Sequence, residues 1–370
     1  MPASSENVGV TLRIDLAGTP PERIRFGVSP LAELTAMLHV LASPEHHPQL
    51  AGWAAGVWAG LRPELAERLR EAEFLWRSSR ADFLVPARPR ATLGAELDEV
   101  DRIDDEWYAH SALVTTCGSN RRTFADRSSL HDPAARAEAL DRAQARGPAQ
   151  EAFAERLLAD PPAVRARVRE TLEQCAEAFF DAEWPALAAR LGRDVRDKTE
   201  LSRRQGLPAA LAEVSAAIAL TPDGGSLVLD KLQDSTAQAG PAGVTLLPSV
   251  FGHPHLVAVY APGWQPVVQY PAAGGERPET VPLETVRLRL EALAHPVRLR
   301  LVRTLARGPH TTGELARAWE LTPPEVSRHL TVLRRAGLLA AHRRGRHVHH
   351  ALDLTATAAL GTDLLAAVLR

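Results

Sequence analysis

The segment TPPEVSRHLTVLRRAG occupies residues 322–337 of the 370-residue chain and has the features of a complete helix. Thr322, followed three residues later by Glu325, forms a capping-box pattern, which predicts that a helix begins here. Three apolar residues at helical spacing predict its buried face: Val326, Leu330 and Leu333. The residues predicted to face outward are Ser327, Arg328, Thr331, Arg334 and Arg335. An exposed face this basic suits a groove lined by phosphates.

The flanking sequence predicts further short elements around this helix. Apolar stripes at 286–293 and 299–305 predict two helices, and the run TTGE at 311–314 opens a third. Beyond Gly337, residues 338–342 and 347–352 are strand candidates around the turn RRGR at 343–346. Helix, turn, helix and an arginine-tipped hairpin together predict a winged helix-turn-helix.

The charge of the chain is unevenly distributed. Its net charge is only −2, yet residues 283–370 contain 14 Arg and no Lys against 7 acidic residues, a balance of +7. The other 282 residues therefore carry −9. A basic module is attached to an acidic one, and basic modules commonly bind nucleic acid.

The segment PAAGGERP at 271–278 has little to bury, so we predict a linker at 271–280. It separates an N-terminal domain, residues 1–270, from the winged helix-turn-helix domain, residues 281–370. This length and composition exclude a disordered or collagen-like chain. Neither a membrane-spanning run nor a secretory leader is evident, so we expect a cytoplasmic protein without membrane contact.

The N-terminal domain reads as a large mixed unit, which makes the whole chain α+β and mainly α. Alternating apolar and polar residues at 10–16 predict a strand, and Ser29-Pro30 predicts the start of a helix over 30–42. An apolar stripe runs from Val164 to Phe179, after which Pro185 and Pro208 are expected to begin new helices. Short β-branched runs within 226–270 predict a small antiparallel sheet.

Two segments of the C-terminal domain carry a family resemblance. LAHPVRLRLV at 293–302 and VSRHLTVLRRAGL at 326–338 resemble the ArsR/SmtB family of bacterial repressors. The resemblance covers roughly residues 284–353. It implies a homodimer on double-stranded operator DNA, a recognition helix in the major groove, a wing on the neighbouring backbone, and repression released by a signal.

The chain departs from this family's pattern at three places. Family metal sensors typically carry Cys in the first helix of the helix-turn-helix, but residues 312–320 contain none. Others place Asp and His ligands on the last helix, where residues 354–370 offer only Asp363. We therefore expect no cofactor and no metal site, and an effector that is not a metal. Finally, Glu320 stands at a turn position often held by Gly, at a cost on the order of 1 kcal/mol if its φ is positive.

The N-terminal domain also resembles an uncharacterised domain fused to such winged helices in high-GC bacteria. The resemblance rests on RFGVSPLAEL at 25–34 and LLPSVF at 246–251. It implies an architecture and no chemistry. Phosphate loops, nucleophile elbows and HExxH motifs are absent from the sequence, so we predict no catalytic residue.

Several residues outside these motifs could have a functional role, but a simpler structural role or a solvent-exposed position is expected for them. The histidines at 46–47 and 253–255 are expected to be solvated loop residues, and those at 342–350 to face phosphate rather than a metal. Cys175 lies on an apolar stripe and is expected in the core, while Cys117 lacks a charged neighbour that would activate it. The aromatic residues of the first 110 positions are expected mainly in the core, with a pocket for an apolar effector as the alternative.

The sequence therefore predicts a transcriptional regulator of ArsR type, expected to be a repressor, whose N-terminal domain senses a small molecule or a protein. The predicted DNA-contacting residues are Thr311, Thr322, Ser327, Arg328, Thr331, Arg334, Arg343, Arg344 and Arg346. Two alternatives stay open. One is an enzyme in residues 1–280 that uses the acidic residues between Asp98 and Glu106, and the other is a winged helix that binds protein instead of DNA.

Overall fold

The computed structural model describes residues 11–77, 79–118, 127–215, 217–230, 235–272, 281–344 and 347–369. These residues fall into two compact units, one that ends at Ala272 and one that begins at Val281. Residues 273–280 of the predicted linker lie outside the described residues. No helix of the described ranges is both long enough and apolar enough to cross a membrane.

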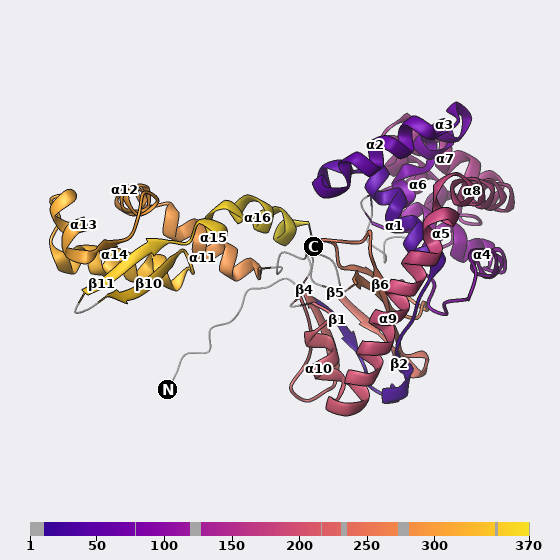
Figure 1. Ribbon diagram of the computed structural model, residues 1–370. Coiled ribbons are helices and arrows are strands. Elements are labelled where there is room, and N and C mark those ends of the chain that lie inside the picture. Colours follow the sequence, from indigo (N-terminus) through magenta and orange to yellow (C-terminus); the bar gives the residue numbers. More distant parts are fainter. Residues whose placement is uncertain are drawn as a thin grey trace. The chain divides into compact units, whose positions relative to one another are not determined.

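The first unit is built mainly of helices (Figure 1). Its α-helices are α1 (Pro30–Ala42), α2 (Ala51–Gly60), α3 (Pro63–Ala72), α4 (Leu93–Asp101), α5 (Asp105–Thr116), α6 (Pro133–Gln144), α7 (Pro148–Ala159), α8 (Pro161–Cys175), α9 (Asp181–Gln205) and α10 (Leu207–Ala212). Single-turn helices include η2 (Pro44–His46) and the π-helical turn η6 (Ala176–Phe180). Figure 1 shows α1 to α8 on one side of the strands, and α9 runs alongside the strands.

Two four-stranded sheets complete this unit. The first has the order β3-β4-β1-β5, formed by β1 (Thr11–Asp15), β3 (Ile218–Leu220), β4 (Ser226–Asp230) and β5 (Ser235–Gln238). The second has the order β2-β6-β8-β7, formed by β2 (Ile24–Phe26), β6 (Val244–Ser249), β7 (Val257–Val259) and β8 (Val267–Pro271). The α+β, mainly α class is confirmed. The expected single antiparallel sheet is instead two mixed sheets, because β1 pairs parallel to β5, and β6 pairs parallel to both β2 and β8.

Local signals explain where α1 begins. The Ser29 hydroxyl accepts a hydrogen bond from the Ala32 amide at 3.0 Å, and Pro30 occupies the first helical position. The predicted helix over 30–42 is confirmed. The expectation that Pro185 begins a helix is wrong. Pro185 lies inside α9, which follows α8 through the π-helical turn without a break.

The core of the first unit contains most of the predicted aromatic residues. Phe74, Trp76, Phe83 and Tyr108 are buried in its main apolar cluster, whereas Trp107 is largely exposed. Both cysteines are buried, and burial raises the pKa of each thiol to about 12. The thiols are therefore protonated and unreactive at neutral pH, as expected for core residues.

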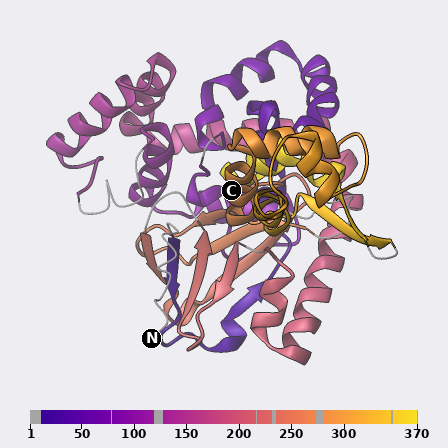
Figure 2. The same cartoon turned by 90° about the vertical axis from the view of Figure 1, so that its left-hand side faces the viewer.

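The second unit has the predicted winged helix-turn-helix architecture. Its elements are α11 (Leu283–Leu293), α12 (Pro296–Leu305), β9 (His310–Thr311), α13 (Thr312–Ala318), α14 (Pro323–Arg335), β10 (Leu339–Arg344), β11 (His347–Leu352), α15 (Leu354–Ala358) and α16 (Leu360–Val368). The three strands form an antiparallel sheet in the order β10-β11-β9. In Figure 2 the hairpin of β10 and β11 extends beyond the helices of this unit.

Candidate nucleic-acid interface

Two capping boxes fix the starts of α13 and α14. The Thr322 hydroxyl accepts from the Glu325 amide at 3.4 Å, and the Glu325 carboxylate accepts from the Thr322 amide at 2.9 Å. Thr311 and Glu314 repeat this arrangement at the start of α13. The two predicted contact residues Thr311 and Thr322 therefore cap helices.

The turn between α13 and α14 contains the predicted backbone irregularity. Glu320 has φ of 53°, which makes it the one described residue other than glycine with a positive φ. The next amide, that of Leu321, donates to the Ala316 carbonyl at 3.0 Å and closes the turn. The turn thus keeps its shape without glycine, at the steric cost that an L-residue incurs in this region.

The faces of α14 are as predicted from the sequence. Val326, Leu330 and Leu333 are buried in the core of the unit, where they pack with residues of α11, α12 and α13. Ser327, Arg328, Arg334 and Arg335 are exposed. Thr331 is half-buried and its hydroxyl donates to the Ser327 carbonyl at 2.9 Å, so it faces along the helix.

The positive charge of this exposed face is not cancelled within its helix. Within the described ranges, neither Arg328 nor Arg334 forms an ion pair. The acidic side chain nearest in sequence, Glu325, is held by the cap. The hydrogen bond from the Thr322 amide, followed by that from the Thr322 hydroxyl, lowers its pKa. The face is therefore available to an external polyanion.

The wing places a second set of arginines close in sequence to the hairpin turn. Arg343 is exposed on β10 and stands opposite Val348, while the backbone of Arg344 pairs with that of His347. Arg346 lies outside the described residues. His350 of β11 is half-buried, and its Nε2 lies 3.4 Å from the Thr312 hydroxyl of α13. Burial lowers the pKa of the His350 ring.

A contact between two histidine rings, which the sequence did not predict, holds α14 against the start of α12. The His329 ring packs on the His295 ring with a centroid separation of 4.9 Å. His295 also caps α12, because its Nδ1 accepts from the Val297 amide at 3.2 Å. This pair ties α14 to the start of α12. Nothing local in the sequence indicated this partner on α14.

The first and last helices of the unit share a buried ion pair and carry exposed apolar side chains. Arg289 of α11 contacts Asp363 of α16 at 2.6 Å, and both side chains are almost fully buried. Asp363 is therefore engaged in packing. Large apolar side chains remain exposed on these helices and on α15 between them: Leu283, Leu288, Leu290, Leu354, Leu365 and Val368. We call these six residues the flanking apolar face.

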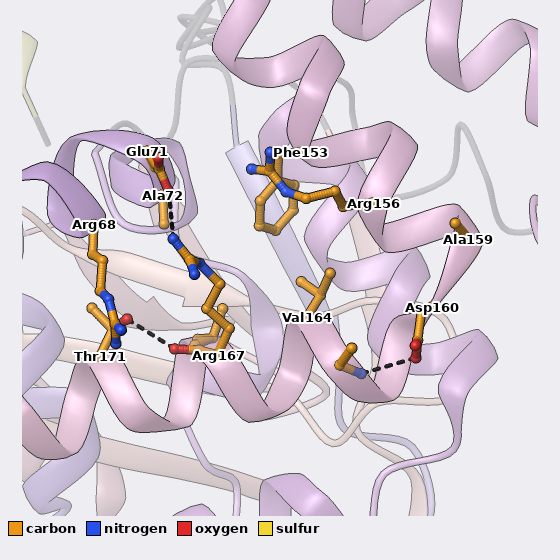
Figure 3. A pocket seen from close by; sticks show the side chains of 12 residues that line it. Arg68, Glu71, Ala72, Phe153, Arg156, Ala159, Asp160, Val164, Arg167 and Thr171 are labelled. Carbon is orange, nitrogen blue, oxygen red and sulfur yellow. Dashed lines mark hydrogen bonds and ion pairs between the residues drawn. The ribbon is translucent and has the colours of Figure 1, made fainter.

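The first unit contains a cavity of about 270 Å³ between α3, α7 and α8 (Figure 3). Phe153, Val164 and Val168 contribute apolar side chains to its lining, and Arg68, Arg156 and Arg167 contribute guanidinium groups. Arg167 is paired with Glu71 at 3.0 Å. None of the tryptophans lines this cavity, so the aromatic pocket considered from the sequence is not what forms here.

The acidic residues considered for catalysis are engaged in structural contacts. Asp98 pairs with Arg169 of α8 at 2.8 Å, and Asp105 pairs with Arg165 at 2.7 Å. Asp104 caps α5 by accepting from the Glu106 amide at 2.9 Å. These contacts fasten α4 and α5 to α8.

The expectation of solvated loop histidines is wrong for the first unit. His47 is fully buried, and His46 and His255 are partly buried. They meet His39 of α1, a residue the sequence did not single out. The contact joins residues more than 200 positions apart, so spacing along the chain could not reveal it.

Different parts of the chain match different known proteins. Residues 293–341 match a helix-turn-helix domain profile. The HTH-type transcriptional regulator Rv2034 of Mycobacterium tuberculosis is 45% identical over 74 residues, which are 20% of this chain and 69% of the relative. The transcriptional repressor SdpR of Bacillus subtilis is 29% identical over 65 residues, 18% of this chain and 72% of the relative. The solved ArsR family regulator RHA00566 is 29% identical, with a TM-score of 0.20 over 21% of this chain and 81% of that structure.

Fold and sequence together define the second unit as an ArsR-type winged helix-turn-helix, the DNA-binding domain of a transcriptional regulator. The chain as a whole belongs to a family of unknown function (DUF5937), whose profile matches residues 10–276. The predicted fusion of the two domains is confirmed.

Proposed function

We propose that this protein is a dimeric operator-binding regulator that places α14 in the major groove and the β10–β11 hairpin on the adjacent DNA backbone. The observation that carries the proposal is the exposed Arg328, which forms no ion pair with the described residues and lies next to Ser327 on a helix whose opposite face is packed. A guanidinium group can donate two hydrogen bonds to the edge of guanine, so Arg328 and Ser327 are the proposed base-reading residues.

The remaining residues serve orientation and affinity. Arg334 and Arg343 are exposed on α14 and β10, and we assign them to phosphate contacts together with Arg344 and Arg346. The Thr331 hydroxyl donates to the Ser327 carbonyl, so we assign Thr331 to holding this part of α14 in place. Thr311 and Thr322 act indirectly in this proposal, because their caps fix where α13 and α14 begin.

The flanking apolar face supplies the dimer contact in this proposal. Leu354 is 61% exposed and Leu365 is 53% exposed, which is unusual for side chains of this size. Pairing these helices across a two-fold axis buries the apolar area and sets two copies of α14 about one helical turn of DNA apart, roughly 34 Å. Relatives with this domain are repressors by name, so we propose repression as the outcome.

The first unit receives the signal in this proposal. The cavity between α3, α7 and α8 has a mainly apolar lining, which suits a small apolar molecule. Such an effector regulates only if it binds one arrangement of the dimer more tightly than the other.

The test compares two arginines of the same helix by fluorescence anisotropy. Arg328→Ala should weaken binding to the operator by about 1–3 kcal/mol and reduce the preference for operator over unrelated DNA. Arg334→Ala, the matched variant, should weaken binding to both duplexes alike and lower the salt slope by about 1. If neither variant changes either titration, the assigned contacts are wrong.

A further inference from the structure

Four histidine rings meet in the first unit, away from the cavity described above. They belong to His39 of α1, His46 at the end of η2, His47 next to it, and His255 of the segment between β6 and β7. The six centroid separations among them lie between 4.7 and 6.4 Å. One ring nitrogen each from His39, His46 and His255 lies within 4.8 Å of the other two.

The rings are oriented with nitrogens toward each other. Nε2 of His39 and Nε2 of His255 are 3.0 Å apart and share a hydrogen bond, whose proton a metal ion would displace. The other nitrogen of His39, Nδ1, lies 3.1 Å from the Trp76 carbonyl oxygen, which can only accept a hydrogen bond. The proton of neutral His39 is therefore on Nδ1, and its Nε2 lone pair points into the cluster. Metal-binding histidines commonly donate their other ring N–H to a carbonyl in this way, which fixes the tautomer.

The surrounding structure fixes these rings in place. The Glu33 carboxylate of α1 accepts hydrogen bonds from the amides of Val250 and Phe251, at 2.9 and 3.2 Å. This anchors the segment that carries His255 to the helix that carries His39. The short helix η2 follows α1 directly, because the His46 amide donates to the Ser43 carbonyl at 3.0 Å. Two distant stretches of chain, one with His39, His46 and His47 and the other with His255, thus meet at one point.

The surroundings of the rings include a buried cationic group and a buried nitrogen without a partner among the described residues. The Arg80 guanidinium is buried and donates to the Gln269 side chain at 2.6 Å, and its charge opposes a cation nearby. Nδ1 of His46 is buried without a hydrogen-bond partner among the described atoms.

We propose that His39, His46 and His255 bind one Zn²⁺ ion through a ring nitrogen each, leaving a fourth coordination position open to water or a small ligand. Three neutral imidazoles are a donor set that Zn²⁺ prefers, and with three protein ligands the tetrahedral ion keeps one position free. His46 and His255 are only partly buried, which gives the ion a path from solvent. His47 packs edge-on against His39 and encloses the site. The proposal stands independently of operator binding.

The experiment measures zinc binding by the full, tag-free chain after removal of metal with a chelator. Equilibrium dialysis followed by elemental analysis should give one Zn²⁺ per chain. Co²⁺ in its place should give visible absorption bands of a four- or five-coordinate ion. His255→Ala and His46→Ala should each weaken binding at least 100-fold and remove those bands.

Two control variants each remove one histidine elsewhere. His131→Ala acts at an exposed position of the first unit, and His349→Ala acts in the wing. Both should bind Zn²⁺ like the unaltered chain. Circular dichroism shows whether each variant folds. If either His255→Ala or His46→Ala fails to fold, zinc binding by the other variant is the test. The proposal is overturned if the unaltered chain binds no Zn²⁺, if both folded cluster variants bind it normally, or if His349→Ala abolishes binding.

Discussion

At the scale of single residues, Glu320 shows how sequence and backbone geometry conflict in the helix-turn-helix. Its φ of 53° is a conformation that glycine adopts freely and other residues adopt at a cost. Glu320→Gly should therefore stabilise the second unit by about 1 kcal/mol. Hydrogen exchange of the α14 amides, followed by mass spectrometry, measures this unfolding free energy.

Glu320→Ala is the matched control, because it removes the same side chain but keeps a Cβ. It should give no stabilisation. If both variants stabilise the unit equally, the side chain and not the backbone conformation is the cause.

At the scale of elements, the ion pair between Arg289 and Asp363 joins α11 to α16. Both side chains are almost fully buried, so removal of one partner leaves the other charge buried and uncompensated. Asp363→Ala should destabilise the second unit by about 3–5 kcal/mol. Scanning calorimetry should show the loss as a lower melting temperature.

The pair between Arg287 and Glu284 offers the comparison on the same helix. Both of these side chains are about half exposed, and exposed pairs contribute little. Glu284→Ala should leave the transition almost unchanged. An equal loss from both variants would show that the buried pair has no special role.

Some helices and strands could be predicted from the sequence, and others could not. The starts of α1, α13 and α14 are marked by residues within one turn of each helix, and all three were predicted. Pro185 misled the prediction, because the π-helical turn before it allows the helix to continue through a proline. The histidine cluster and the parallel strand pairs depend on contacts between distant segments, for which the sequence carries no local sign.

At the scale of the whole molecule, the proposed dimer depends on the flanking apolar face. Leu365→Glu should convert the proposed dimer to a monomer, since a buried carboxylate at the interface is costly while the exposed site tolerates it in the monomer. Sedimentation equilibrium measures the mass. Val348→Glu makes the same change at a comparably exposed site on β11 and should leave the dimer intact. A Leu365→Glu dimer of normal stability would place the interface elsewhere.

We propose that α14 and the hairpin of each of two subunits bind one operator. Sequencing the duplexes that the purified full chain retains from a random pool tests this binding mode. We expect enrichment of an inverted repeat whose half-sites are centred about one helical turn apart, roughly 34 Å. Retention of sequences with no common motif, or retention of no DNA at all, would contradict it.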